Sequence, residues 1–305
     1  MLSIFIFVDF AHKKMNHKTE YLLFKIFQSL IESLPLEVAQ KSGKFLGRVA
    51  FRVLKSRRNV AMENLRFAFP SKSETEREGI TRGAFESFGI SMAEFLWTRN
   101  LSREKIASLV IFEDQFEMEK ILARNSGLVL VSGHLGNWEL MALATGIFLS
   151  KQVLIIVKKQ HNERIDKEIS NLRCIFGNSI VTMEKAIKES LTRLKSNGIV
   201  ALLSDQSAPK ESVYINFFRR NVATFQGPSA FALKSNAPMA MLFMIRQQGG
   251  KYKLFCEEIH CSDLDSYSEE NVAKLTQRHV EVLERWITKY PEQWLWMHKR
   301  WKNVK

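Results

Sequence analysis

The fold of this chain is decided by the stretch Leu128-Val129-Leu130-Val131-Ser132-Gly133-His134-Leu135-Gly136-Asn137-Trp138-Glu139-Leu140. Its first four residues are apolar and predict a short buried strand. Ser132 and Gly133 end that strand, and the sequence after them is helix-like. A buried strand followed by a turn and a helix indicates an open α/β sheet, in which ligands bind at the carboxyl ends of the strands. We therefore expect His134 to lie at a ligand-binding edge.

His134 and Glu139 are the residues of this stretch that are suited to acid–base chemistry. The unperturbed pKa of a histidine allows proton transfer near neutral pH. Glu139 falls one turn into the expected helix, from where its carboxylate can reach back and hold the ring. We predict that His134 is a general base and that Glu139 orients it. The alternative is a loop histidine that caps the helix and a glutamate that complements the helix dipole.

The sequence around His134 supplies no nucleophile of its own. There is no Gly-x-Ser-x-Gly elbow, and the three cysteines stand far from the histidine at positions 174, 256 and 261. A histidine–carboxylate pair without a nucleophile is suited to activating a hydroxyl that the substrate brings. The pattern therefore favours acyl transfer to an alcohol over hydrolysis through a covalent intermediate.

The context Gly-His-x-Gly-Asn-Trp-Glu at residues 133–139 resembles the His-x4-Glu signature of the bacterial lipid A late acyltransferases, the lauroyl/myristoyl acyltransferase family. The more distant glycerolipid acyltransferases usually carry Asp at the second position. Other elements similar to this family follow in the family's order: Asn-Leu-x3-Phe-Pro at 64–70, Asp-Gln at 205–206, Thr-x-x-Gly-Pro at 224–228 and a Pro-Glu-Gln-aromatic-x-Trp-x-His ending from 291. The resemblance runs from about Leu34 to Lys302.

The resemblance implies further site residues. Arg173 matches a functional arginine of the family, and a fixed guanidinium can stabilise a thioester oxyanion or bind an acidic group of the substrate. The alternative for Arg173 is a surface helix arginine. Lys158 stands where the family has Arg, which keeps the charge but loses the bidentate fork. The candidate substrate-binding residues are Asn137, Lys158, Asn162, Arg164, Asp205 and Gln206.

Other apolar runs extend the sheet. Val153 to Val157 and Ile199 to Leu203 read as further buried strands, and the second of them ends at Ser204-Asp205-Gln206. We expect Asp205 to help shape the site, with a loop or helix-capping residue as the alternative. A hairpin is predicted over 213–225, two more strands over 237–259 and a long final helix from Ser268. Together these patterns predict an α/β fold with a mostly parallel central sheet and helices on both faces.

The 305 residues carry a formal net charge of +13, which requires an acidic partner. The sequence has no helix-turn-helix signature, no zinc-ligand spacing and no RNA-recognition pattern, so we expect no nucleic acid and no metal. An odd number of cysteines without a Cys-x-x-Cys motif predicts no disulfide framework. The predicted partners are therefore an anionic membrane and acidic substrates.

The N-terminal part is expected to associate with that membrane. Over residues 38–54 and just beyond, basic residues recur every three or four positions between apolar ones, at Lys41, Lys44, Arg48, Arg52 and Lys55. Such a helix can lie on an anionic surface, or it can pack on the domain with a solvated basic face. We predict membrane-associating helices over 1–56 and an acyltransferase domain over 57–305. The apolar run from Ile4 to Phe10 is too short to cross a bilayer, and we do not interpret it as a signal peptide.

The resemblance implies the rest of the reaction. The donor would be an acyl carrier protein thioester, no cofactor would be needed, and the acceptor would be a hydroxyl of a lipid A precursor at the cytoplasmic face of the inner membrane. Lys158 and Arg164 would attract acidic headgroups or the acidic carrier protein. The alternatives are an acyltransferase for another glycolipid or lysophospholipid and a non-catalytic membrane-surface protein on the same fold.

Overall fold

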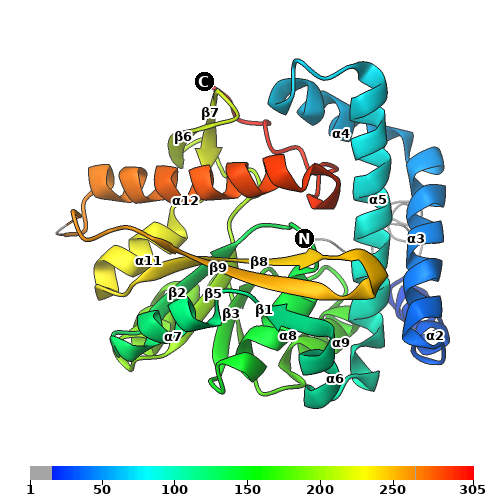
Figure 1. Cartoon of the computed structure of the whole chain (residues 1–305), viewed down its shortest axis with the longest axis horizontal. Helices are drawn as coiled ribbons and strands as arrows, with labels where there is room; N and C mark the ends of the chain where they lie inside the picture. The colour runs from blue at the N-terminus through cyan, green and yellow to red at the C-terminus, as the bar shows by residue number, and fades with distance from the viewer. Residues whose placement is uncertain (1–15, 265) are drawn as a thin grey trace.

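The computed structural model describes residues 16–264 and 266–305, so the apolar run from Ile4 to Phe10 lies outside the described residues. A seven-stranded sheet in the order β1-β9-β8-β2-β5-β3-β4 forms the centre of the molecule (Figure 1). Neighbouring strands run parallel except for β8 and β9, which pair antiparallel. This arrangement confirms the predicted α/β fold with a mostly parallel sheet.

The strands of the sheet are short, and the middle ones are apolar throughout. All five residues of β2 are buried, as expected for a parallel strand that is covered on both faces. The predicted hairpin is also confirmed, as a separate two-stranded sheet of β6 (Val213–Phe217) and β7 (Arg220–Thr224). The strands of the main sheet are β1 (Val110–Phe112), β2 (Leu128–Ser132), β3 (Val153–Val157), β4 (Ser179–Thr182), β5 (Ile199–Leu203), β8 (Met239–Arg246) and β9 (Tyr252–Ile259).

Helices cover both faces of the sheet (Figure 1). Right-handed connections place α8 (Trp138–Phe148) and α9 (Glu163–Cys174) on one face. The chain reverses direction after β4, which places α10 (Ala186–Lys195) and α11 (Gly227–Ser235) on the other, where α11 contacts α12 (Glu269–Lys289). Shorter helices complete the layers: α6 (Arg103–Leu109), α7 (Gln115–Ala123), η2 (Gln248–Gly250) and η3 (Pro291–Gln293).

The N-terminal helices stand at one end of the sheet. They are α2 (His17–Glu32), α3 (Leu36–Val53), α4 (Lys55–Ala68) and α5 (Glu74–Leu96), which continues into η1 (Trp97–Asn100). Figure 1 shows α3 and α5 side by side. The two helices approach so closely that a Cβ on Gly47 would lie 2.3 Å from the carbonyl oxygen of Phe85.

The expected helix over 38–54 is present as α3, preceded by α2. Among the residues that the structure describes, no helix is both long and apolar enough to cross a membrane. The division of the chain at residue 56 and the association with a membrane stay predictions.

Candidate active site

The loop from Gly133 to Asn137 connects β2 to α8 and carries His134. Backbone hydrogen bonds fix it from two sides: Leu295 N donates to His134 O over 3.1 Å, and Asn137 N donates to Met244 O over 2.9 Å. Gly136 has a φ of +66°, and a Cβ there would lie 1.8 Å from the Met244 carbonyl oxygen. Only glycine fits this position, so the loop geometry follows from one residue of the motif.

Asp205 holds the His134 ring. Its carboxylate accepts a hydrogen bond from the ring Nδ1 over 2.7 Å and another from the backbone N–H of His134 over 2.7 Å. Trp294 Nε1 donates a third over 2.8 Å. Because a carboxylate only accepts, Nδ1 carries the proton and Nε2 of the neutral ring is left as the acceptor. The residue that orients the ring is therefore Asp205, and the prediction that Glu139 does so is wrong.

The Asp205 carboxylate is ionised near neutral pH. Burial acts to raise its pKa, but the charge of His134 and the hydrogen bonds from His134 and Trp294 outweigh burial and lower the pKa to about 2. A buried carboxylate of this kind stabilises the imidazolium that forms when Nε2 takes a proton. His134 and Asp205 thus have the geometry of a general base and its positioning residue.

Glu139 forms a buried ion pair with Arg173. Arg173 Nε donates to Glu139 Oε2 over 2.9 Å, and Nη2 donates to Oε1 over 2.6 Å. Burial acts to raise the pKa of Glu139, but the charge and hydrogen bonds of Arg173 lower it overall. The first turn of α8 and the last turn of α9 meet here, so the carboxylate points towards α9 instead of the His134 ring.

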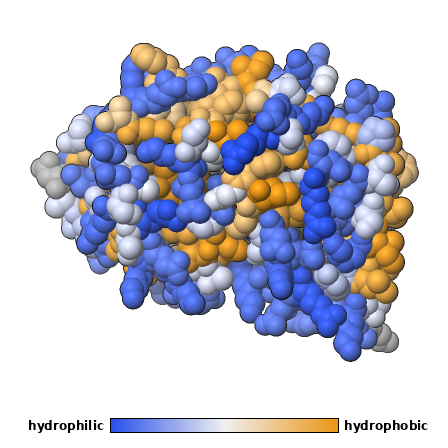
Figure 2. Space-filling view, turned by 90° about the horizontal axis from the view of Figure 1, so that it is seen from below, coloured by the Kyte–Doolittle hydropathy of each residue, from blue (hydrophilic) through white to orange (hydrophobic). Residues whose placement is uncertain are grey.

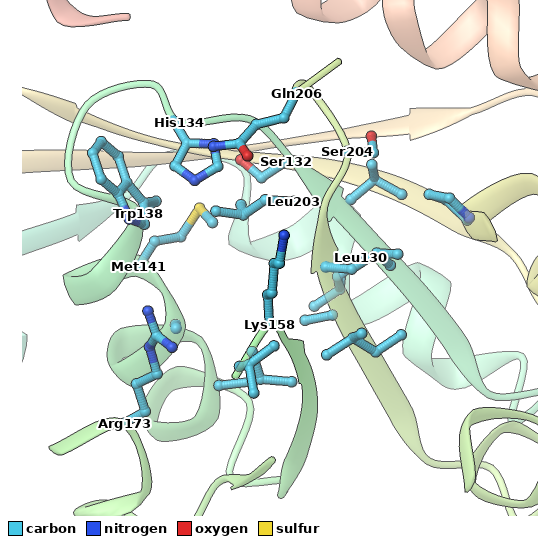
Figure 3. Close-up of a pocket in the computed structure, with 18 of the residues that line it drawn as sticks. Leu130, Ser132, His134, Trp138, Met141, Lys158, Arg173, Leu203, Ser204 and Gln206 are labelled. Carbon is cyan, nitrogen blue, oxygen red and sulfur yellow. The ribbon is translucent and has the colours of Figure 1, made fainter. Parts of the chain in front are cut away.

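An apolar cavity of about 470 Å³ lies against these groups, within the roughly 300–1,000 Å³ that is typical of small-molecule sites. Five of the predicted site residues line it: His134, Glu139, Lys158, Arg173 and Gln206. Figure 3 shows His134 and Gln206 in the upper part of this pocket, with Lys158 and Arg173 below them. The remaining wall is mostly aliphatic and aromatic, with side chains from β2, α8, β3, α9, β5 and α11.

Gln206 follows Asp205 in the chain and lines the same cavity as His134. Its Nε2 is buried and has no hydrogen-bond partner among the described residues. A buried amide donor without a partner costs free energy unless a ligand supplies an acceptor. Gln206 is therefore suited to bind a substrate oxygen beside His134.

Asn137, Asn162 and Arg164 are not part of the cavity wall, although all three were predicted to bind substrate. Asn137 is fully buried and caps α8, since its Oδ1 accepts from Leu140 N over 2.9 Å. Asn162 caps α9 by accepting from Arg164 N and holds α2 by donating to the carbonyl of His17. Arg164 is exposed, with its guanidinium over the ring of Tyr21. Asparagine is a strong helix N-cap, and this role accounts for both asparagines.

Sequence reasoning missed two groups that support the site. His298 lines the cavity, and its Nε2 accepts from the backbone N–H of Ser207 over 3.0 Å. Burial lowers the pKa of His298 to about 4, which keeps it neutral. Glu94 accepts hydrogen bonds from Asn137, Arg246, Tyr252 and Gln40, and so ties the loop of His134 to α3, α5, β8 and β9. No local pattern indicates Glu94, because its partners are distant in sequence, whereas His298 is the histidine of the Pro-Glu-Gln-aromatic-x-Trp-x-His ending.

Comparison with known proteins gives one consistent result. The family model described as bacterial lipid A biosynthesis acyltransferase matches residues 10–303. The lipid A biosynthesis lauroyltransferase of Escherichia coli strain K12 is 27% identical over 277 residues, which cover 90% of this chain and 88% of the relative. The palmitoleoyltransferase of the same organism is 26% identical over 274 residues, with 88% and 87% covered. A lipid A biosynthesis acyltransferase of Haemophilus influenzae is 25% identical over 281 residues, with 89% and 84% covered.

Proposed function

The chain belongs to the bacterial lipid A biosynthesis acyltransferase family, and from this premise we propose that it transfers a fatty acyl chain from an acyl carrier protein thioester to a hydroxyl of a lipid A precursor. The observation that carries the proposal is the His134–Asp205 pair at the edge of an apolar cavity. The pair supplies a base, and the cavity supplies a place for a fatty chain. In this proposal the transfer requires neither a nucleophile from the protein nor a cofactor.

The reaction begins when the acceptor hydroxyl donates a hydrogen bond to Nε2 of His134. The hydroxyl oxygen attacks the thioester carbonyl while Nε2 takes its proton, and Asp205 stabilises the resulting imidazolium. The tetrahedral intermediate then collapses to the ester. The carbon–sulfur bond breaks, and the leaving thiolate takes the proton back from His134, so the base is regenerated.

Two donors of the cavity wall support the reacting carbonyl in this proposal. Gln206 lines the cavity, and its Nε2 is buried without a partner among the described residues. Arg173 also lines the cavity and is held by its two hydrogen bonds to Glu139. Fixed donors of this kind stabilise charge that develops on a carbonyl oxygen.

We propose that the enzyme works at the cytoplasmic face of the inner membrane, bound through α2 and α3. Four large apolar side chains of α2 are exposed, at Leu22, Leu23, Ile26 and Leu30. Figure 2 shows apolar side chains gathered at the right-hand edge, over α2 and α3. Helix α3 adds the exposed Phe45, Lys41 and Arg52, whereas Lys44 and Arg48 pair with Glu86 of α5. An apolar stripe beside basic residues is the pattern of a helix that lies in an anionic interface.

The membrane proposal is tested by cosedimentation with anionic phospholipid vesicles. Replacing Ile26 and Leu30 by glutamate should abolish sedimentation at physiological salt, because both side chains would have to enter the headgroup region. Replacing the exposed Phe116 of α7, on another part of the surface, should leave binding unchanged. Equal binding of both variants would contradict the assignment of this surface.

The acyl transfer itself is tested by incubating the chain with an acyl carrier protein thioester and a lipid A precursor, and measuring the mass of the lipid product. We expect a mass increase of one acyl group. His134→Ala should lower the rate by several orders of magnitude, while its circular dichroism and melting temperature stay those of the natural chain. Near-normal turnover in His134→Ala would refute the role of the histidine. Transfer only to another glycolipid or lysophospholipid would correct the acceptor.

A further inference from the structure

The cavity reaches the molecular surface beside the carboxyl ends of β3 and β4. These strands are paired so that Val157 lies opposite Thr182, which brings the next residues, Lys158 and Met183, side by side. Met183 is 50% exposed and Ile187 is 66% exposed, yet both line the same cavity as His134. Two large apolar side chains therefore stand in water at one opening of a cavity that has the catalytic base in its wall.

Positive charge surrounds this opening. The surface that we call the rim consists of Lys158, Lys159, Met183, Lys185, Ile187 and Lys188, all exposed. The same segments also carry the acidic Glu163, Glu184 and Glu189. Lys159 is paired with Glu163 over 3.0 Å. Within the described part of the chain, Lys185 and Lys188 have no ion-pair partner.

We propose that the rim is the docking surface for the carrier protein, and that the acyl chain enters the cavity past Met183 and Ile187. The proposal rests on the proposed function, since it takes the donor to be a thioester on an acidic protein. An acidic surface complements the lysines of the rim, and such complementarity mainly raises the rate of productive encounter. The flexible arm that bears the acyl group then leads its thioester along the cavity towards His134.

The composition of the rim favours a protein over a lipid surface. The rim exposes two large apolar side chains, Met183 and Ile187, and charged residues surround them. In contrast, α2 exposes Leu22, Leu23, Ile26 and Leu30 along one helix, as insertion into a membrane requires. A small apolar centre within a charged surround is typical of a transient protein interface. The two surfaces therefore suit different partners.

Charge reversal of the rim tests the proposal. Lys185 is the N-cap residue of α10 and Lys188 lies in its first turn, where negative charge is favourable. The double variant Lys185→Glu/Lys188→Glu should therefore fold normally, which its melting temperature checks. Its transfer rate is measured with two donors that share one acyl chain: the carrier protein thioester, and acyl-pantetheine, which has no protein part.

We expect kcat/KM for the carrier protein donor to fall roughly 10- to 100-fold at low salt, while kcat/KM for acyl-pantetheine stays unchanged. The difference between the variant and the natural chain should shrink as ionic strength rises, because salt screens exposed charges. Lys120→Glu/Lys274→Glu is the matched control, since both side chains are exposed lysines outside the rim. The control should leave both donors unaffected.

Four outcomes overturn the proposal. An equal loss with both donors means that the variant perturbs the cavity itself. No loss with either donor means that the carrier protein docks elsewhere. Reduced sedimentation with anionic vesicles, together with an unchanged rate from the carrier protein donor, assigns the rim to a lipid surface. If the natural chain transfers from acyl-pantetheine but not from the carrier protein, both the donor of the proposed function and the rim proposal fail. Loss of transfer only in the rim variant leaves the proposed function intact.

Discussion

Asp205 receives three hydrogen bonds, two of them from His134 and one from Trp294. Because Asp205 binds both the ring and the backbone N–H of His134, it fixes the orientation of the imidazole as well as its position. The contact arises from the strand register, since Ser132 of β2 lies opposite Leu203 of β5. His134 and Asp205 each stand two residues beyond this pair, so the carboxyl ends of two parallel strands bring them together.

The role of Asp205 leads to a kinetic prediction. Asp205→Asn should lower kcat by roughly 10² to 10⁴-fold with little change in KM, because an amide can hold the ring in the wrong tautomer and cannot stabilise the imidazolium. Steady-state kinetics with the carrier protein donor measures the effect. Trp294→Phe removes only one of the three hydrogen bonds to the same carboxylate and leaves both bonds from His134, so it should cost about tenfold or less. A normal kcat in Asp205→Asn would contradict the assignment.

Glu139 should behave differently from Asp205, because its partner is Arg173. Glu139→Gln leaves the guanidinium without its counter-charge and should destabilise the fold by about 3–5 kcal/mol. Urea denaturation monitored by circular dichroism measures this loss. Adding Arg173→Met should recover much of the stability without restoring activity, since the buried charge is then removed. A stable Glu139→Gln variant that has lost only kcat would instead support the direct role predicted from the sequence.

At the scale of elements, α3 and α5 touch through their backbones. A Cβ on Gly43 would lie 2.5 Å from the carbonyl oxygen of Gly89, and a Cβ on Gly47 would lie 2.3 Å from that of Phe85. The Gly-x3-Gly spacing in α3 thus serves close helix packing inside the protein. This packing also sets the position of Gln40, which donates to Glu94 over 2.7 Å in the network beneath the catalytic loop.

The same substitution at two glycines should have opposite effects. Gly47→Ala should destabilise the fold by about 1–3 kcal/mol, because α3 and α5 would have to move apart. Gly79→Ala, on the exposed side of α5, meets nothing within 4 Å and should stabilise it by up to about 1 kcal/mol through helix propensity. Thermal or urea unfolding of the two variants measures the change in stability, which should be a loss for Gly47→Ala and a gain for Gly79→Ala. Stabilisation by Gly47→Ala would show that the helices are not in close contact.

At the scale of the whole molecule, buried neutral histidines make stability depend on pH. His279 of α12 is fully buried, and neither ring nitrogen has a partner among the described residues. Burial, and secondarily the charge of Arg300, lower its pKa to about 3. The unfolded chain takes up this proton below pH about 6.5, whereas the folded chain does so only near 3. The free energy of unfolding therefore falls as the pH drops from about 6.5 towards 3.

His279→Leu should remove this contribution. When the pH falls from 7 to 5, the free energy of unfolding should drop by about 2 kcal/mol less in the variant than in the natural chain, because only the unfolded natural chain binds the extra proton. Urea unfolding at both pH values measures the gain. The exposed His260, which has no such burial, provides the control in His260→Leu. An identical pH dependence in His279→Leu and the natural chain would show that the buried ring is already charged.

The molecule as a whole carries two surfaces that adjoin. Helices α2 and α3 lie at one end of the sheet (Figure 1), the rim lies at the carboxyl ends of β3 and β4, and His17 of α2 contacts His161 just beyond the rim. The cavity connects the rim to His134. Under our two proposals, the acceptor comes from the membrane at α2 and the donor docks at the rim, so the two substrates use different surfaces.

The sequence alone predicted the α/β class, the strands β2, β3 and β5, the β6–β7 hairpin and the histidine at the end of β2. These features depend on local patterns: apolar runs, turn residues and a motif at fixed spacing. The edge strands β1 and β4 are only three and four residues long, too short to give such a pattern. Asn137 and Asn162 were predicted to bind substrate, but both are helix N-cap residues, a role for which asparagine is typical.

Only the tertiary structure decided which carboxylate serves His134. Glu139 is close in sequence, but the first turn of α8 directs it towards Arg173 on α9. Asp205 is 71 residues away, yet the parallel pairing of β2 with β5 places it against the ring. A local motif determines which residue types are present and where the chain turns. The partner of each side chain depends on strand register and helix packing, which bring distant segments together and which no short stretch of sequence contains.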